Sequence, residues 1–543
     1  EEDESQALAE EENFFHECAA EDLCRDFVGR VDILKSLTEW TDAAGTGIVT
    51  LIGSAGIGKS AVAASFGRAS AKVHAAKNPT KPLAVITHCV GASPSSLSLR
   101  GLLMRLCNEL GKVAGEVQKE LPQDSKGLER EFARLLEVAS FRTRLLLIID
   151  GIDQIPEADR AFSLSWLPKN AAAKIILTVS EAGETLRALR QRSPPAKELV
   201  VGPLELRERR ELIERILARF HKRLDERPMN DQMRMILKKT DSSKPLFCVV
   251  VCEELRVFGV FEKLTDRIKL LGVSLNKLIE EVLDRLEADH GRDLVANALS
   301  VIACSRGGLY EHELLRITRR TATEEMLPSA LWSPLALSLQ AFVRRVQGLP
   351  ICFNNSLLAT TVEHRYVGTP QRVKQVHAQL AAYFLEEVDP AHDATFNGSK
   401  RGVSEVAYHL ACAQMWPQLV HVLTSLNFVE RKCTFGMTHD LIADYLAVTS
   451  SSSEQVATPS VAVAPPRRRL GLTSSSNTVQ TGFAGINQVR EFASFVAANS
   501  HILASRPHLT FQQAANQPDT SAPAISAAKY LLSRTFIKWT NKP

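Results

Sequence analysis

A phosphate-binding pattern lies near the start of the chain and is its clearest chemical signal. Residues Gly53, Ser54, Ala55, Gly56, Ile57, Gly58, Lys59 and Ser60 fit G-x-x-x-x-G-K-[ST]. A β-branched run at 48–52 precedes the pattern, and a helix-forming run that begins at Ala61 follows it. Glycines in this context let backbone N–H groups turn inward around phosphates at a helix N-terminus. We expect residues 53–61 to bind a nucleotide, the alternative being a chance glycine-rich turn.

Two side chains of this loop have assigned chemical roles in such a site. The Lys59 ammonium is expected to neutralise the β- and γ-phosphates of ATP or ADP, and the Ser60 hydroxyl to ligate Mg²⁺.

An apolar strand that ends in an acid supplies the second chemical feature. Residues 145–149 form the apolar run, and Asp150 follows, where its carboxylate can hold the Mg²⁺ shell beside the loop. Many ATPases place a water-activating Glu directly after this acid, but here the position is Gly151. Asp153 is the nearest remaining carboxylate and the candidate catalytic base, the alternative being a helix N-cap; Gln154 could only orient water. We therefore expect slow hydrolysis.

A third strand, at 174–180, should lie next to the strand that ends in Asp150. Its end is where a polar group could sense the terminal phosphate. Thr178 and Ser180 are the candidates, and ordinary strand-end capping is the alternative. Because no Arg occupies this position, sensing is expected to be weak or supplied from elsewhere.

Composition bounds the class of protein. The chain has 543 residues, which suggests roughly three to four domains. Hydrophobic residues make up 45% and charged residues 23%, as in soluble globular proteins, and a net charge of +3 gives no case for a nucleic-acid or membrane surface. Ten cysteines without a CxxC pair suit a reducing compartment, so we expect a cytoplasmic or nuclear protein, or one found in both. The acidic N-terminus does not resemble a signal peptide.

The order of apolar runs predicts the fold class. Strand-like runs separated by helical stretches indicate an α/β P-loop NTPase domain, with a parallel sheet covered by helices on both faces. The runs are 48–52, 83–89, 145–149, 175–179 and 199–201. From residue 205 onward amphipathic helices dominate, so mostly α-helical domains should follow.

Several segments together resemble a known family. Residues 27–30 (FVGR), the phosphate-binding loop and 150–153 (DGID) resemble the NACHT branch of the STAND signalling ATPases. Three downstream segments resemble the telomerase-associated type of NACHT–WD-repeat protein: 222–226, 253–256 and 537–543. The similarity covers most of residues 27–543.

The resemblance implies a succession of a nucleotide-binding domain (27–204), a small helical domain (205–289), a winged helix (290–370) and a helical arm, which we divide into a helical domain (371–448) and a helical segment (479–543). Composition adds an acidic arm (1–26), which is expected to be solvated because its first 24 residues carry many acids and no Lys or Arg, and a flexible linker (449–478) rich in Ser, Pro, Val and Thr.

The resemblance also implies two nucleotide contacts. Pro245 occupies the place of the family's Gly-x-Pro segment and would pack against adenine, the alternative being a simple helix start. Many relatives carry a His in the winged helix that touches the ADP β-phosphate. The matching stretch, 353–356, has no His, and His364 nearby is expected to face solvent or core.

The resemblance makes this chain a fragment. WD repeats would follow residue 543, and RNA binding would belong to regions absent from the chain. The Pro465–Arg469 cluster is read as a solvated loop, with a nuclear address or phosphate contact as the alternatives.

Three functions compete at this stage. The first is an ATP-controlled switch and scaffold of a larger assembly, one that could include RNA, with protein partners and without a membrane. The second is a turnover ATPase that acts on nucleic acid. The third is a degenerate structural module, against which the intact Lys59, Ser60 and Asp150 argue.

Overall fold

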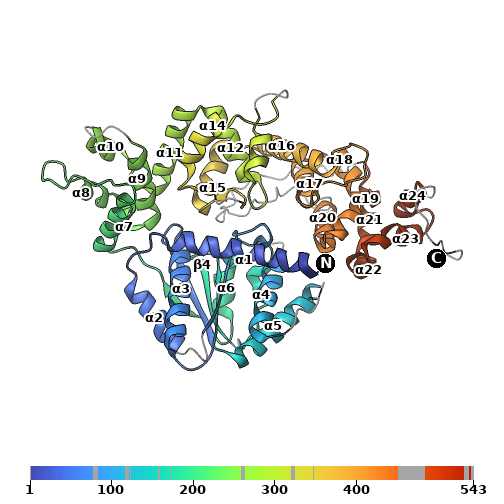
Figure 1. Ribbon diagram of the computed structural model, residues 1–543, viewed down its shortest axis with the longest axis horizontal. Coiled ribbons are helices and arrows are strands. Elements are labelled where there is room, and N and C mark those ends of the chain that lie inside the picture. The colour runs from blue at the N-terminus through green and yellow to red at the C-terminus, as the bar shows by residue number, and fades with distance from the viewer. Residues whose placement is uncertain are drawn as a thin grey trace, which may run out of the picture. The chain divides into compact units, whose positions relative to one another are not determined.

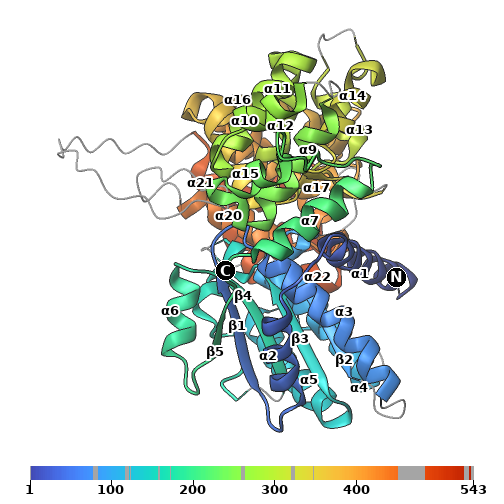
Figure 2. The same ribbon diagram turned by 90° about the vertical axis from the view of Figure 1, so that its left-hand side faces the viewer.

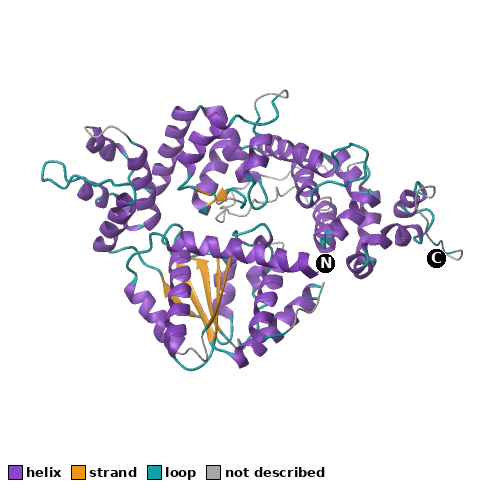
Figure 3. Ribbon diagram, viewed as in Figure 1, coloured by secondary structure: helices purple, strands orange, loops and turns teal. Residues whose placement is uncertain are grey.

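The computed structural model describes residues 2–77, 83–116, 121–122, 124–156, 159–170, 173–258, 263–319, 324–345, 348–450, 484–530, 537 and 539 (Figure 1). The chain divides into two compact units. The first comprises Glu1–Ala296, Gly307–Glu311 and Pro328–Thr361, and the second Asn297–Arg306, His312–Leu327 and Val362–Pro543. Figure 3 shows that helices account for most of the regular structure outside one sheet.

The sheet of the first unit has five parallel strands in the order β2-β3-β4-β1-β5. They are β1 (Gly47–Gly53), β2 (Ala84–Cys89), β3 (Leu145–Asp150), β4 (Lys174–Ser180) and β5 (Lys197–Val200). The register pairs Gly53 with Ser180, and Ile149 with Leu177. The C-terminal ends of β1, β4 and β3 therefore meet at one edge, where ligands bind in open parallel sheets.

Helices cover both faces of this sheet, as the alternating pattern predicts (Figure 2). Alternate residues of each strand point to opposite faces. Leu147 and Ile149 of β3 share a core with α4 (Leu99–Ala114), α5 (Ser125–Arg142) and α6 (Glu184–Gln191). Leu146 and Ile148 share a second core with α2 (Val31–Asp42) and α3 (Lys59–Lys77). The predicted α/β class is confirmed.

The N-terminal segment is a helix with a buried face, and the prediction of a solvated arm is wrong for it. Helix α1 (Glu2–Cys24) buries Phe15, His16 and Ala19. His16 Nδ1 accepts a hydrogen bond from the Cys89 N–H at 2.9 Å, and its ring lies 4.4 Å from that of His88. Glu10, Glu11, Glu17 and Glu21 are exposed, whereas the buried residues recur at helical spacing against β2 and α3.

The rest of the first unit is mainly helical. It contains α7 (Leu206–Ala218), α8 (Gln232–Leu237), α9 (Pro245–Val257), α10 (Leu264–Leu270), α11 (Leu275–His290) and α14 (Ser329–Leu339). Helix α7 begins with a capping box in which the Glu208 carboxylate accepts the Glu205 N–H at 2.8 Å.

The predicted winged-helix range, 290–370, has the element order of that motif. It runs through α12 (Arg292–Cys304), the strand-like residue Leu309, α13 (Glu311–Ile317), α14 and the hairpin of β6 (Val343–Arg344) and β7 (Cys352–Phe353). Leu309 forms an antiparallel bridge with Ile351, and β6 pairs with β7. Helix α15 (Ser356–Val362) follows.

The second unit is built of helices. After a π-helical turn (Glu363–Val367) it contains α16 (Pro370–Val388), α17 (Lys400–Ala413), α18 (Trp416–Leu423), α19 (Leu426–Thr434), α20 (Thr438–Ser450), α21 (Ile486–Ala498), α22 (Ser500–Ser505), α23 (Thr510–Ala515) and α24 (Ala522–Ala528). Residues 449 and 450, assigned to a linker, end α20, and 451–478 lie outside the described residues, as does the Pro465–Arg469 cluster.

Within the described part of the chain, we find no helix with the length and apolarity that a bilayer crossing requires.

Candidate functional site

The phosphate-binding loop joins β1 to α3 at the sheet edge described above. Gly56 and Gly58 adopt φ values of 77° and 94°, a conformation that favours glycine. The loop therefore turns as a phosphate cradle does, directly into the N-terminus of a long helix. This matches the strand–loop–helix context that the sequence predicts.

Lys59 is folded back over the loop. Its Nζ donates to the carbonyl oxygens of Gly53 at 2.7 Å and Ser54 at 3.2 Å. Burial lowers the pKa of Lys59, while the negative charges of Asp153, Asp150 and Glu181 oppose that shift. A bound polyphosphate would replace the loop carbonyls with stronger, anionic acceptors, so this cation fits the nucleotide role expected of it.

Asp150 lies at the end of β3, 8% exposed. Thr178 Oγ1 donates to Asp150 Oδ1 at 2.6 Å and accepts the Gly151 N–H at 2.7 Å, so Thr178 orients the acid. Burial raises the pKa of Asp150, whereas hydrogen bonds from Thr178 and Ser60 lower it. Ser60 and Asp150, the two oxygen ligands expected for Mg²⁺, both lie at this edge of the sheet beside the loop, so their chemistry fits the metal.

Asp153 lies one turn further on and is held by the end of β4. Its Oδ2 accepts the Ser180 N–H at 3.0 Å and the Ser180 hydroxyl at 2.6 Å. It does not cap the short helix Ile152–Gln154, since Gly151 is the N-cap, so the helix N-cap alternative is wrong. Both phosphate-sensing candidates therefore hydrogen-bond to the acids: Thr178 donates to Asp150, and Ser180 donates to Asp153.

The backbone at Gly151 disfavours a base. Its φ is 75°, and a Cβ at this position would lie 2.8 Å from Gln154 Nε2. A Glu in this position would need both a strained backbone and a displaced Gln154.

The helical part of the first unit touches the loop through the start of α9. The Leu246 N–H donates to the Gly56 carbonyl at 3.3 Å, and a Cβ built on Gly58 would lie 3.4 Å from Pro245 Cγ. Pro245 opens α9 and also faces the phosphate-binding loop, so both roles considered for it are compatible with the structure.

Two residues near the loop were missed by the sequence reasoning. Glu181 follows β4 directly, is exposed, and acts electrostatically on Lys59. Arg30 is buried and donates to the Ile57 carbonyl at 2.8 Å. Glu181 could have been found from the pairing of β1 with β4, because it directly follows Ser180, the partner of Gly53. The sequence around Arg30 gave no indication of its contacts beyond its place in the family's FVGR segment.

The polar residues of the wing make local contacts. Asn354 donates its N–H to the Phe342 carbonyl at 3.0 Å, and Asn355 caps α15 by accepting the Leu358 N–H at 2.8 Å. His364 is exposed on the π-helical turn, so of the two expected environments, solvent or core, it has the first.

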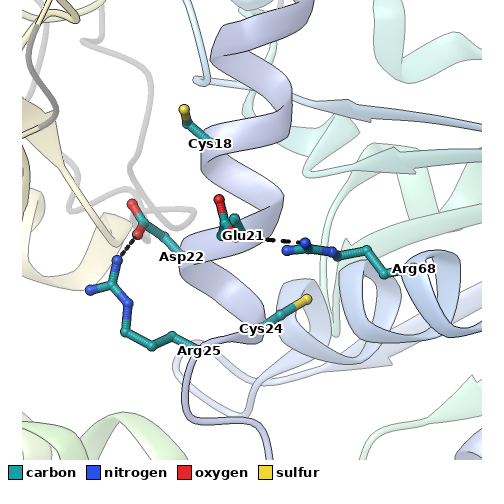
Figure 4. A pocket seen from close by; sticks show the side chains of 6 residues that line it. All are labelled: Cys18, Glu21, Asp22, Cys24, Arg25 and Arg68. Atoms are coloured by element: carbon teal, nitrogen blue, oxygen red, sulfur yellow. Dashed lines mark hydrogen bonds and ion pairs between the residues drawn. The ribbon is translucent and has the colours of Figure 1, made fainter.

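A separate pocket of about 540 Å³ lies beside α1 (Figure 4). Its lining residues are Cys18, Glu21, Asp22, Cys24, Arg25 and Arg68. Arg25 pairs with Asp22, and Arg68 with Glu21 at 3.6 Å, so its charges are internally balanced. None of its lining residues belongs to the phosphate-binding loop.

Comparison with known proteins agrees with the resemblance read from the sequence. Residues 26–179 match the AAA ATPase domain family, and residues 373–456 match the APAF-1 helical domain family. Telomerase protein component 1 of Mus musculus is 29% identical over 530 residues, which cover 90% of this chain and 19% of that protein. NACHT domain- and WD repeat-containing protein 1 of Homo sapiens is 25% identical over 398 residues, covering 68% of this chain and 25% of that protein.

The predicted relationship is thus confirmed. The chain carries an AAA ATPase domain and an APAF-1 helical domain and has homologues among the telomerase protein component 1 and NACHT–WD-repeat proteins. It spans only about a fifth of the length of the telomerase protein component 1 relatives.

Proposed function

We propose that this homologue of NACHT–WD-repeat ATPases is an ATP-binding, slowly hydrolysing switch that helps to scaffold a larger assembly. One observation carries the proposal: the buried Asp150 at the end of β3, held by Thr178 at 2.6 Å, lies at the same edge of the sheet as the phosphate-binding loop and Ser60 at the start of α3. This arrangement supports binding of ATP or ADP with Mg²⁺, where Lys59 and the loop amides would hold the phosphates and the metal would neutralise their charge.

Slow hydrolysis is supported by the environment of the carboxylates. Gly151 cannot be replaced by a Glu without strain, and Asp153, the proposed base, already accepts two hydrogen bonds from Ser180 at one of its oxygens. A base that is displaced by two positions and partly engaged should activate water less efficiently than a Glu at position 151. Each nucleotide state would then persist long enough to act as a signal.

Switching is supported by the contact between the loop and α9. Because Leu246 bonds to the loop and Pro245 packs over it, a nucleotide that changes the loop would bias the helices that follow. The relatives' names extend the proposal to protein partners and to a ribonucleoprotein setting, with RNA bound by regions outside this chain.

The direct test is calorimetric titration of wild type and Lys59→Ala with Mg·ATP. Wild type should bind ATP, and the variant should lose at least about 100-fold in affinity because the loop's cation no longer offsets the phosphate charge. Equal affinities would overturn the nucleotide site. Steady-state ATPase rates with and without RNA separate a switch from a motor, since only a motor should be strongly accelerated by nucleic acid.

A further inference from the structure

Arg30 makes three main-chain contacts from a buried position. It is 7% exposed, and its Nη2 donates to the Ile57 carbonyl of the phosphate-binding loop at 2.8 Å. Its Nη1 donates to the Gly202 carbonyl and to the Pro203 carbonyl, the latter at 3.4 Å. One guanidinium therefore links the loop to the connection between β5 and α7.

The backbone around Arg30 is fastened to α7 as well. We call residues 26–30 the strap. The Arg30 N–H donates to Glu208 Oε1 at 2.6 Å, and Glu208 also forms the capping box of α7. Arg215 Nη1 donates to the Phe27 carbonyl at 2.7 Å, and Arg219 pairs with Asp26 at 2.5 Å.

The strap is held in a conformation that these contacts must maintain. Gly29 has φ 62°, and a Cβ there would lie 1.9 Å from Glu208 Oε1, so only glycine fits. Arg30 itself has φ 60°, which is unfavourable for a residue with a side chain. Such strain persists only where surrounding contacts fix it, and it is concentrated at functional sites.

The chemistry of the loop gives this contact a role. A phosphate cradle directs N–H groups inward, and its carbonyl groups must then point outward and find partners. Ile57 lies between Gly56 and Gly58, the two loop residues with positive φ, and its carbonyl oxygen accepts the hydrogen bond that Arg30 donates. Without that donor, a buried acceptor would be left unpaired and the loop could relax away from the cradle shape.

We propose that Arg30 is a positioning residue for nucleotide binding. It fixes the shape of the phosphate-binding loop through Ile57 and couples that loop to α7 through Gly202, Pro203 and Glu208. The inference rests on the proposed ATP binding and adds that the loop's affinity for phosphates depends on a residue that touches no phosphate.

The test compares Arg30→Ala, Arg30→Lys and the control Arg215→Ala for binding of Mg·ATP and of Mg·tripolyphosphate, which has no base or sugar. Arg30→Ala should weaken both ligands by a similar factor of at least about ten, because the loop's outward carbonyl loses its donor. Arg30→Lys should restore part of the loss, since lysine keeps a donor but not the fork. Arg215→Ala cuts one strap–α7 contact without touching the loop, and should stay within about twofold of wild type.

Each result of this test either supports or overturns the role assigned to Arg30. Wild-type affinity in both Arg30 variants, or an equal loss in Arg215→Ala, would overturn the role assigned to Arg30. Weaker ATP binding with unchanged tripolyphosphate binding would also overturn it, because Arg30 would then act on the base or sugar. Should Arg30→Ala fail to fold, Arg30→Lys carries the comparison. A wild type that binds neither ligand would defeat the proposed function itself.

Discussion

The two carboxylates of the site differ at the scale of single residues because their partners differ. Asp150 is buried and held by Thr178, whereas Asp153 is exposed and held by Ser180. The sequence predicted both acids and the loop from motif spacing alone. It could not assign Thr178 and Ser180 to their acids, because those pairings depend on the register of β4 between β1 and β3.

Asp150→Asn should separate metal binding from phosphate binding. In wild type Mg²⁺ should strengthen ATP binding by at least about tenfold, and in the variant by less than about twofold, because the carboxylate acts through the metal while Lys59 and the loop amides hold phosphate directly. Titrations with and without Mg²⁺ check this. Equal Mg²⁺ effects in the two proteins would show that Asp150 is not the metal ligand.

The same variant has a consequence for stability. Burial raises the pKa of Asp150, so its protonated form favours folding, and this contribution is lost as pH rises through the folded-state pKa. At neutral pH the ionised side chain therefore costs stability, and nucleotide-free Asp150→Asn should melt at the same temperature as wild type or higher. A clearly lower melting temperature would contradict this.

Asp153→Asn should lower kcat for ATP by about 100-fold, as expected for loss of a general base, and change the affinity for ATP by less than about threefold. Ser180→Ala is the matched control. It should lower kcat by less, because the N–H of residue 180 still holds the acid. The check is to measure kcat and the affinity for ATP in parallel for each variant. An unchanged kcat in Asp153→Asn would show that Asp153 is not the base and has only a structural role.

At the scale of elements, the chain's first helix shows where composition misleads. Many acids at the N-terminus indicated a solvated arm, yet Phe15 and Ala19, and Glu12, His16 and Ala20, recur at the four-residue spacing of one helix face. Periodicity was present and could have been used. The partner of that face, the edge strand β2, could not be read from the sequence, because packing against it depends on strand order.

The second unit contains a buried histidine pair between α16 and α17. His377 Nδ1 and His409 Nδ1 are 2.9 Å apart, so one neutral ring donates to the other. Phe384 stacks on His409, and Tyr408 meets it edge-on. Glu405 Oε2 lies 3.9 Å from His409 Nε2, and Arg306 and Arg401 contact Glu405. The two arginines add to the effect of burial in lowering the pKa of His409.

This pair should make the second unit sensitive to acid. Burial lowers the pKa of His377 to about 4 and that of His409 well below its usual value. Between about pH 6.5 and the folded-state pKa the unfolded chain binds more protons, so stability is full above this window and falls as pH drops, by about 1.4 kcal/mol per pH unit for each proton.

Replacing one ring tests the assignment. His377→Asn keeps a polar partner for His409 and removes one titrating group. Calorimetric scans at pH 7 and pH 5 should show a smaller drop in the midpoint of the second unit's transition in this variant than in wild type. Equal drops would mean that other groups carry the acid response.

At the scale of the whole molecule, the sequence predicted the sheet and the helical remainder because both follow from hydrophobic periodicity. The five strand runs lie within about two residues of β1–β5. The strap and its contacts to α7 were not predicted, since they join segments about 180 residues apart through hydrogen bonds that leave no local pattern. The contacts between the phosphate-binding loop and the helices that follow, on which the proposed switch depends, likewise leave no local pattern in the sequence.

The most direct test of the switch is small-angle scattering of the full chain saturated with Mg·ADP and with a non-hydrolysable ATP analogue. Lys59→Ala treated in the same way is the control. We predict that the two wild-type curves differ, that the two Lys59→Ala curves coincide, and that ATP turnover stays well below about 10 s⁻¹, so that each state lasts. Wild-type curves that coincide while both nucleotides are bound, with turnover at or above that rate, would contradict the account.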